Sequence, residues 1–287
     1  MTQNILFCLI FIASTIFAGT IVSAQQENVK EDFKAVVINE SVRNMNAEIF
    51  ASADQAAVKK YLPEDGAPAS MSSFVLFAGN DVVLVDTGLG GSQWVKGLAD
   101  LGVKPEKIKL ILLTHMHGDH IGGLLDGNRR RFPNAEVLSA ELEYNYWLPQ
   151  DSKAKTPQLE KIKTAYGNDF SKTFEFDEQV FENAVMKIKA FNAVGHTPGH
   201  TAFLAESSKS RLLIVGDLLH AAVLQFPAPE ICSRYDMEPI ATAASRKRIL
   251  DFAVKQNLVI GGMHFPVPNI GMVKNNNQGG YEFLPVK

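Results

Sequence analysis

The chain has 287 residues, of which 46% are hydrophobic, so it is long enough to bury the core of one large domain. Its net charge of −3 and its pI near 6.2 give no reason to expect nucleic acid or an anionic membrane surface as a partner. The two cysteines, Cys8 and Cys232, do not suggest a disulfide framework. We therefore expect stability to come from packing and from bound metal.

The first residues carry an export pattern. Residues 5–24 are almost uncharged and end in Val22-Ser23-Ala24, a small-x-small pattern that signal peptidase accepts. We predict a signal peptide over residues 1–24, a periplasmic or secreted mature protein, and no stable membrane association after cleavage. The residues before the apolar run lack Lys and Arg, and the run is long enough to be retained as a membrane anchor, which is the alternative.

Residues 25–70 are mixed and polar, and we interpret them as an N-terminal extension packed on the main domain at 71–287. In that domain, two apolar runs flank Gly79-Asn80, which predicts a β-hairpin. A helix is expected over 92–102, with Gly102 at its end. Buried strands are expected at 107–114 and 135–140, followed by a largely helical segment over 141–182.

Three more strands are predicted in the second half of the chain, at 184–194, 201–207 and 211–217. An amphipathic helix is expected over 241–256, and the last clear strand over 258–264. Strands that arrive in pairs with helices between them predict an α/β layered fold with sheets at its centre.

All seven histidines lie at or after residue 115. The stretch "LLTHMHGDHIGG" (112–123) places three of them and an aspartate within six positions. Hydrophobic strands end just before His115, Asp217 and His264, and such strand ends converge at one edge of a sheet. Imidazoles and carboxylates without thiolates suit a catalytic Zn²⁺, Mn²⁺ or Fe²⁺ and argue against a structural zinc knuckle.

The motif "THMHGDHIGG", followed by "GHTPGHT" and "GDLLH" and preceded by "VDTGLGG", resembles the metallo-β-lactamase fold superfamily. The resemblance implies an αβ/βα sandwich with a dinuclear metal site at one edge of the sheets. It implies that the first ion is bound by His115, His117 and His200. It implies that the second is bound by Asp119, His120 and His264, with Asp217 bridging both ions.

Two divalent ions, expected to be Zn²⁺, would share a hydroxide and polarise the bond that it attacks. Asp119 would orient this nucleophile while it holds the second ion. Asp86, in "VDTG", is expected to accept the N–H of a ligand imidazole, unless it is simply an aspartate in a turn. His196 is a candidate for the same kind of supporting role, or a polar loop residue.

Asp217 stands where dedicated β-lactamases generally have Cys or Ser, which argues against a β-lactam substrate. Stretches such as "RFPNAEVLSA", "YNYWLP" and "HFPVPNIGMVK" resemble the methyl parathion hydrolase and lactonase branch. That branch implies a dinuclear enzyme, often a homodimer, that opens lactones or aryl esters and in some members cleaves phosphotriesters.

His220 follows Asp217 by three residues and is expected beside the ions, where it could protonate a leaving alkoxide or phenoxide. This favours a lactone or ester; the alternative is a histidine without chemical duty. Trp147 and Trp94 resemble aromatic positions of the branch that line the substrate pocket, although both could be helix residues that pack inward.

The sequence thus predicts a secreted metal-dependent hydrolase that acts on a small molecule. The alternatives are a β-lactam hydrolase and a catalytically silent metal-binding domain. The native metal, the physiological substrate and the oligomeric state stay open.

Overall fold

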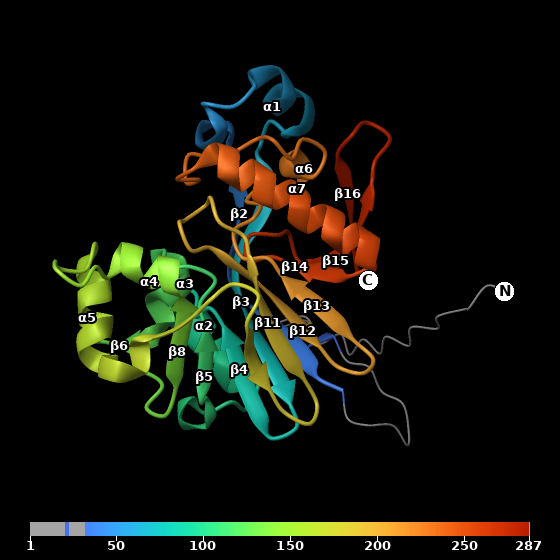
Figure 1. The fold of residues 1–287 in the computed structure, drawn as a ribbon. Helices are drawn as coiled ribbons and strands as arrows, with labels where there is room; N and C mark the ends of the chain where they lie inside the picture. Colours follow the sequence, from blue (N-terminus) through green and yellow to red (C-terminus); the bar gives the residue numbers. More distant parts are fainter. Residues whose placement is uncertain (1–20, 23–31, 287) are drawn as a thin grey trace.

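The computed structural model describes residues 21–22 and 32–286, which form two facing β-sheets with helices on their outer sides (Figure 1). The first sheet contains, in spatial order, β1 (Ile21–Val22), β2 (Lys34–Met45), β3 (Ala67–Ala78), β4 (Asp81–Val85), β5 (Leu110–Leu112), β8 (Glu136–Ala140) and β9 (Lys172–Phe174). The second contains β10 (Gln179–Glu182), β11 (Lys187–Asn192), β12 (Thr201–Glu206), β13 (Arg211–Ile214), β14 (Val259–Gly261), β15 (Ile270–Asn275) and β16 (Tyr281–Pro285). The predicted α/β layering is confirmed.

The helices are α1 (Gln55–Tyr61), α2 (Ser92–Asp100), α3 (Gly118–Ile121), α4 (Glu141–Trp147), α5 (Pro157–Tyr166), α6 (Ala222–Gln225) and α7 (Pro239–Gln256). Short 3₁₀ turns are η1 (Ala47–Phe50), η2 (Pro105–Lys107), η3 (Gly122–Leu124) and η4 (Gly167–Phe170), and β6 (Leu125–Asp126) pairs with β7 (Arg129–Arg130) in a separate hairpin. The expected helix 92–102 and the expected helix 241–256 correspond to α2 and α7.

The main core lies between the two sheets. Phe74 and Leu76 of β3 face Phe203 of β12 and Ile214 of β13, and all four side chains are buried. Each large apolar side chain buried in this way contributes about 1.5–3 kcal/mol. Because alternate residues of a strand point to opposite faces, the same strands also supply apolar side chains to the outer layers.

The helices cover the outer faces. Trp94 and Leu98 of α2 pack on the first sheet, and Ile249 and Leu250 of α7 pack on the second. Helix α7 begins with Pro239 in its first turn and ends at a left-handed Asn257, which are favourable residues for these positions. The sandwich therefore has a rigid layer on each side of the strand ends that carry the histidines.

The stretch predicted as an N-terminal extension contributes a full strand to the first sheet. Strand β2 pairs with β3 along its length, with a register shift between Asn39 and Ser41. Its second half is polar and mostly exposed, which hides the strand pattern in the sequence. Strands β15 and β16 also lie beyond the last strand that we predicted.

The predicted signal peptide lies outside the described residues, apart from Ile21–Val22. Across 21–22 and 32–286, no helix has the length and apolarity that a bilayer crossing needs.

Candidate metal centre

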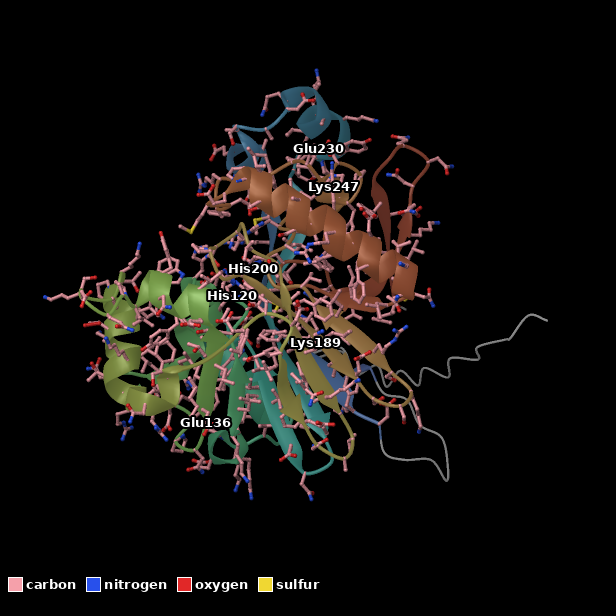
Figure 2. All side chains as sticks on the ribbon, viewed as in Figure 1. His120, Glu136, Lys189, His200, Glu230 and Lys247 are labelled. Carbon is pink, nitrogen blue, oxygen red and sulfur yellow. The ribbon has the colours of Figure 1, made fainter. Side chains whose placement is uncertain are left out.

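Loops that follow four strands bring the candidate ligands to one end of the sandwich. His115 and His117 follow β5, His196 follows β11, Asp217 follows β13 and His264 follows β14. Figure 2 shows His120 and His200 at this end, with Glu136 at the opposite end of the first sheet. Six of the seven histidines reach one centre, although they lie as far apart in the sequence as His115 and His264.

Three imidazoles and a carboxylate form a first cluster. His117 Nδ1 lies 3.0 Å from His115 Nε2 and 3.0 Å from His196 Nε2. Asp217 Oδ2 lies 3.4 Å from His196 Nε2 and 3.8 Å from His115 Nε2. All four donor atoms are within 4.8 Å of one another, which is close enough for one ion to bind them together.

The second cluster contains Asp119, His120 and His264. The Asp119 carboxylate lies 3.8 Å from His120 Nε2 and 3.6 Å from His264 Nε2. Asp217 joins this cluster also, since its Oδ1 is 3.2 Å from His120 Nε2 and its Oδ2 is 3.1 Å from His264 Nε2. Asp217 is thus placed between the two clusters, as a bridging ligand requires.

The donor atoms themselves indicate a cation. His120 Nε2 and Asp217 Oδ1 are buried and have no hydrogen-bond partner among the described residues. Buried polar atoms normally have a partner, and a divalent ion would supply one to both. Imidazole nitrogens with carboxylate oxygens are a common donor set for catalytic zinc. The residues therefore fit two divalent ions.

Hydrogen bonds on the far side of each ring orient the donor nitrogens. His120 Nδ1 lies 2.7 Å from Asp86 Oδ2, and His264 Nδ1 lies 2.8 Å from the carbonyl oxygen of Ser70. An Nδ1–H that donates to such an oxygen leaves the lone pair of Nε2 free to bind a metal. Both rings are thus held in the tautomer that the second cluster needs.

Asp86 occupies the position that we predicted for it, against a ligand imidazole. Its carboxylate also accepts the backbone N–H of Thr114 (2.8 Å) and the Thr114 hydroxyl (2.7 Å). Asp86 is fully buried and adopts a left-handed conformation with φ of 59°. Aspartate tolerates this region better than most residues, and the three hydrogen bonds hold it there.

The assignment of His200 to the first ion is corrected by the structure. His200 Nδ1 lies 2.9 Å from the carbonyl oxygen of Ala193, and its Nε2 accepts the backbone N–H of Asp217 at 3.0 Å. Both ring nitrogens are therefore occupied by the backbone. His196 takes its place with His115 and His117.

His200 has a structural task. Its ring lies under the loop that carries Asp217, where Gly216 has φ of +56°. A Cβ at Gly216 would lie 2.6 Å from His200 Nε2, so both the conformation and the space require glycine. His200 thereby supports the bridging carboxylate without facing the donor atoms.

Glu143 is a buried residue of the site that we did not predict. Its Oε1 accepts the N–H groups of Met116 (2.9 Å) and of the Trp147 indole (2.7 Å). Its Oε2 accepts the Thr197 hydroxyl (2.7 Å) and the Gly199 N–H (2.9 Å). Glu143 thus joins the loop of His115 and His117 to the loop of His196. A glutamate in the first turn of a helix is too common to signal this role.

Protonation differs between the clusters. Burial lowers the pKa of His115 well below its ordinary value, and the charge of His120 adds to this effect. Burial, together with His196, lowers the pKa of His117 to about 4. These two imidazoles are therefore neutral at pH 7 and available to a metal ion.

In the second cluster the carboxylates dominate. Burial alone would lower the pKa of His120, but Asp217 and Asp86 raise it well above its ordinary value. The pKa of His264 is raised by Asp217 in the same way, against the effect of burial. Burial would raise the pKa of Asp217, but His120 and His264 hold it well below the usual range. Protons on these imidazoles must leave when a cation binds.

His220 lies beside the bridging carboxylate, where its position in the sequence placed it. Its Nε2 is 3.4 Å from Asp217 Oδ2, and its ring stacks on His264 with centroids 5.2 Å apart. The Nδ1 atom is buried and has no hydrogen-bond partner among the described residues. Burial lowers the pKa of His220, and Tyr235 covers the ring with centroids 5.6 Å apart.

A cavity of about 340 Å³ opens onto both clusters. It is lined by Arg43, Met45, His117, Gly118, Asp119, His196, Asp217, His220, Tyr235 and His264. Arg43 and Met45 come from β2, so the strand that we took for an extension forms one wall. Tyr235 is the aromatic side chain of the lining, and it is 37% exposed.

Neither tryptophan lines this cavity. Trp94 is fully buried under the first sheet and donates its indole N–H to Ser73 Oγ at 2.7 Å, so its predicted pocket role is wrong. Trp147 lies next to the cavity, with its ring edge against His117 and centroids 5.6 Å apart. Its indole N–H is taken by Glu143, which makes it a support for His117.

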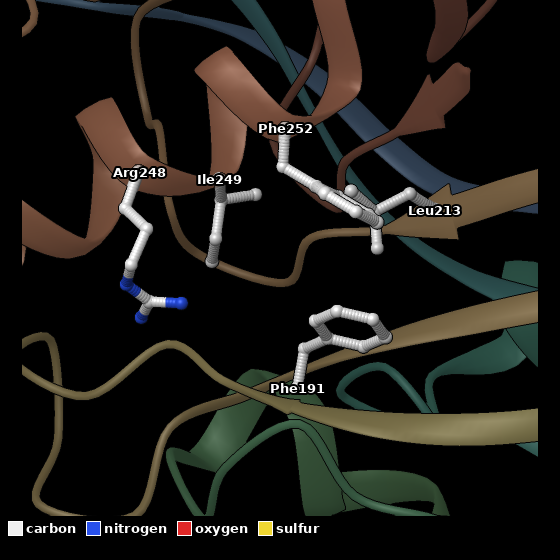
Figure 3. A pocket seen from close by; sticks show the side chains of 5 residues that line it. All are labelled: Phe191, Leu213, Arg248, Ile249 and Phe252. Atoms are coloured by element: carbon white, nitrogen blue, oxygen red, sulfur yellow. The ribbon is translucent and has the colours of Figure 1, made fainter. Parts of the chain in front are cut away.

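A second hollow of about 110 Å³ lies between α7 and the second sheet. Figure 3 shows its lining of Phe191, Leu213, Arg248, Ile249 and Phe252. Apolar side chains and one guanidinium form this lining. Among the described residues that line it, there is no carboxylate, imidazole or nucleophile. The chemistry therefore belongs to the larger cavity.

The family model of the metallo-beta-lactamase superfamily matches residues 67–251, which is well over half of the chain. The chain belongs to the metallo-beta-lactamase superfamily. Its sequence is also 26% identical over 150 residues to an atrochrysone carboxyl ACP thioesterase of Passalora fulva, a match that covers 52% of this chain and 38% of that protein. The chain spans between 36% and 57% of the length of the curated relatives it matches.

Two solved structures are similar over almost the whole chain. The hydrolase AbOPH has a TM-score of 0.81 and 25% identity, with 96% of this chain and 99% of that chain covered. The dizinc quorum-quenching lactonase AidC has a TM-score of 0.78 and 22% identity, with 94% and 98% covered. The metallo-beta-lactamase fold is thus shown, with the two ligand clusters at the edge of its sheets.

Proposed function

We propose that this protein is a dinuclear metal-dependent hydrolase that opens lactones or aryl esters. The observation that carries the proposal is the arrangement around Asp217, whose two oxygens face donor atoms of both clusters at the floor of one cavity. The first ion would be held by His115, His117 and His196, and the second by Asp119, His120 and His264, with Asp217 between them. Zn²⁺ is the ion that we expect.

When bound, two divalent ions activate a water molecule and polarise the carbonyl oxygen that the water attacks. The protein supplies the positions. Asp119 lines the cavity with a side chain that is 25% exposed, so its carboxylate can orient the incoming nucleophile. Tyr235 and Met45 offer an aromatic and a thioether surface to the apolar part of a substrate.

His220 is the candidate hydrogen-bond donor to the leaving oxygen of the substrate. Its Nε2 is beside Asp217 in the cavity wall, where an N–H can donate a hydrogen bond to the oxygen that departs from the acyl carbon. An alkoxide released by a lactone needs such a donor far more than a nitrophenolate does. The resemblance to the lactonase branch and the similarity to AidC support the same choice.

A matched substrate panel tests the proposal. The chain from Gln25 onward is loaded with Zn²⁺ and offered an acyl-homoserine lactone, an aryl ester, a phosphotriester and a β-lactam, each with and without chelator. We expect chelator-sensitive lactone or ester hydrolysis well above the other two rates. Equal, chelator-insensitive rates on all four would contradict the proposal.

Two variants then isolate the leaving-group donor. His220→Phe should lower kcat for the lactone by about 100-fold to 1,000-fold, the usual effect of removing one donor from a developing oxyanion. His220→Tyr keeps a donor on a ring of similar size and should retain most of the rate. If Phe and Tyr act alike, His220 has no such role.

A thioester is the second candidate substrate, because the match to the thioesterase of Passalora fulva covers half of this chain. A thiolate leaves without help from an acid. Hydrolysis of an acyl thioester that is fast in both wild type and His220→Phe would favour this candidate.

The same panel tests the two remaining alternatives. Turnover of the β-lactam would contradict the argument that Asp217 disfavours a β-lactam substrate. Two bound ions without any turnover would indicate a catalytically silent metal-binding domain.

We further propose that the protein is exported after cleavage at Ala24 and acts as a homodimer on small molecules, without a nucleic-acid or stable membrane partner. N-terminal sequencing of the protein from the native host would identify the cleavage site. Sedimentation of the mature chain would give the oligomeric state.

A further inference from the structure

Asp236 and Arg246 form a buried ion pair directly behind the first cluster. Asp236 Oδ1 lies 3.0 Å from Nδ1 of His196, the nitrogen on the far side of the ring from the donor atoms. Asp236 Oδ2 accepts the backbone N–H of Ser233 at 2.7 Å and lies 3.8 Å from Arg246 Nη2. Both side chains of the pair are fully buried.

Arg246 extends from α7 into the interior, and its guanidinium donates to three loop carbonyl oxygens. The Nε atom donates to the carbonyl oxygen of Leu218 at 2.6 Å, in the residue that follows Asp217. The Nη1 atom donates to the carbonyl oxygens of Pro229 (2.8 Å) and Ile231 (2.7 Å). The Nη2 atom has no hydrogen-bond partner among the described residues, which leaves it directed at Asp236.

We propose that Asp236 and Arg246 are positioning residues for the first metal ion, an inference that rests on the proposed metal centre. Asp236 accepts Nδ1–H of His196, which fixes the tautomer and directs the lone pair of Nε2 to His117 and Asp217. Asp236 cannot turn away, because Ser233 and Arg246 hold its other oxygen.

The same guanidinium acts on the bridging carboxylate through the backbone. By holding the Leu218 carbonyl, Arg246 limits the movement of the turn that carries Asp217 and, three residues further on, His220. Helix α7 is rigidly packed on the second sheet, so it provides a fixed base for both contacts. A buried ion pair adds little stability compared with apolar residues of similar size, and orientation is a better reason for this one.

The test compares zinc affinity in variants of the full mature chain. Asp236→Ala and Arg246→Gln should each weaken the affinity of the first cluster for Zn²⁺ by about 10-fold to 100-fold, the usual effect of removing a partner of a metal ligand. Competition with a chromophoric chelator gives the affinity. The absorption bands of the Co²⁺-loaded protein report whether the ligand geometry has changed.

Asp251→Asn is the matched control. Asp251 is a carboxylate of α7 that accepts the hydroxyl of Tyr281 at 2.7 Å, and neither residue lines the cavity. This variant should lower the unfolding temperature without changing the zinc affinity or the cobalt spectrum. The double variant Asp236→Ala/Arg246→Gln removes both charges and should lose less affinity than the sum of the two single losses.

The proposal is overturned if Asp236→Ala and Arg246→Gln lower stability as the control does but keep the zinc affinity within about twofold and the cobalt spectrum unchanged. Should Arg246→Gln not fold, Arg246→Lys keeps the charge but not the planar fork and answers the same question. Lactone turnover is measured separately, so its failure counts against the proposed substrate, whereas the ratio of zinc affinities decides the positioning role.

Discussion

The two ligand clusters share Asp217 but differ in charge. The first contains three imidazoles, of which His115 and His117 have pKa values below the ordinary one. The second contains Asp119, and its two imidazoles have raised pKa values. The same residue types therefore make one cluster that is ready for an ion and one that must first release protons. The difference arises from the carboxylates that lie within reach of each ring.

The largest effect should come from Asp217, which serves both clusters. Asp217→Asn should remove the bridging charge, lower the content of both ions and reduce hydrolysis by about 1,000-fold or more, since metal ions supply several kcal/mol of transition-state stabilisation. Elemental analysis of the dialysed protein measures the ions. Asp119→Asn is the comparison, because it should lose the second ion alone. Two retained ions in Asp217→Asn would contradict the bridging role.

The next effect separates the two histidines of "GHTPGHT". His196→Ala should weaken the affinity of the first cluster for its ion by at least about 100-fold, because a direct ligand is removed, and the dialysed protein should lack this ion. His200→Gln should keep both ions and instead lose about 1–3 kcal/mol of stability, since the Asp217 N–H and the Ala193 carbonyl lose their shared buried partner. Metal content and urea unfolding of the two variants measure this. The opposite pattern would restore the assignment that we made from the sequence.

Asp86→Ala acts on the second cluster alone. Without this acceptor His120 loses its orientation, and the affinity for the second ion should fall about 10-fold to 100-fold. The first ion should stay bound with nearly unchanged affinity. Stepwise titration of the metal-free protein with Zn²⁺ distinguishes the two sites. An equal loss at both sites would show that Asp86 supports the whole loop and not one ring.

Acidification gives the smallest and most gradual effect. The pKa of His115 is lowered and that of His117 is about 4, so protons compete little for these two ligands between pH 5 and 7. The raised pKa values of His120 and His264 mean that protons compete for the second site already near neutrality. The second ion should therefore dissociate first as the pH falls, with affinity dropping about tenfold per pH unit for each displaced proton. Titration with Zn²⁺ at pH 5, 6 and 7 checks the order.

Much of the site could be predicted because its ligands are close in sequence. His115, His117, Asp119 and His120 lie in one short loop, and a strand before that loop determines which end of the sheet they reach. A supporting role for Asp86 against a ligand imidazole could also be predicted, since Asp86 directly follows the neighbouring strand β4. Local pattern and strand order were sufficient for these residues.

The choice between His196 and His200 was not accessible in that way. Both follow a glycine in one loop, and their spacing does not say which ring faces the ions. The answer depends on Ala193 and Asp217, whose backbone groups take both nitrogens of His200. The first of these groups is seven residues away and the second is seventeen.

The aromatic residues make the same point. Trp94 and Trp147 were selected because they resemble pocket positions of the lactonase branch, but Tyr235, Arg43 and Met45 line the cavity instead. Strand β2 reaches the cavity because it pairs with β3 over eleven partner positions. The second half of β2 is polar, so the sequence pattern there does not indicate a strand.

The sequence by itself determined the superfamily, the layered fold and most of the metal ligands, because these depend on short motifs and on the periodicity of buried strands. Only the tertiary structure decided that His196 is the ligand, that Glu143, Asp236 and Arg246 support the loops, and that β2 forms a cavity wall. Those features depend on which backbone and side-chain groups satisfy one another in a water-free interior. That pairing is made between residues distant in sequence, and no local pattern records it.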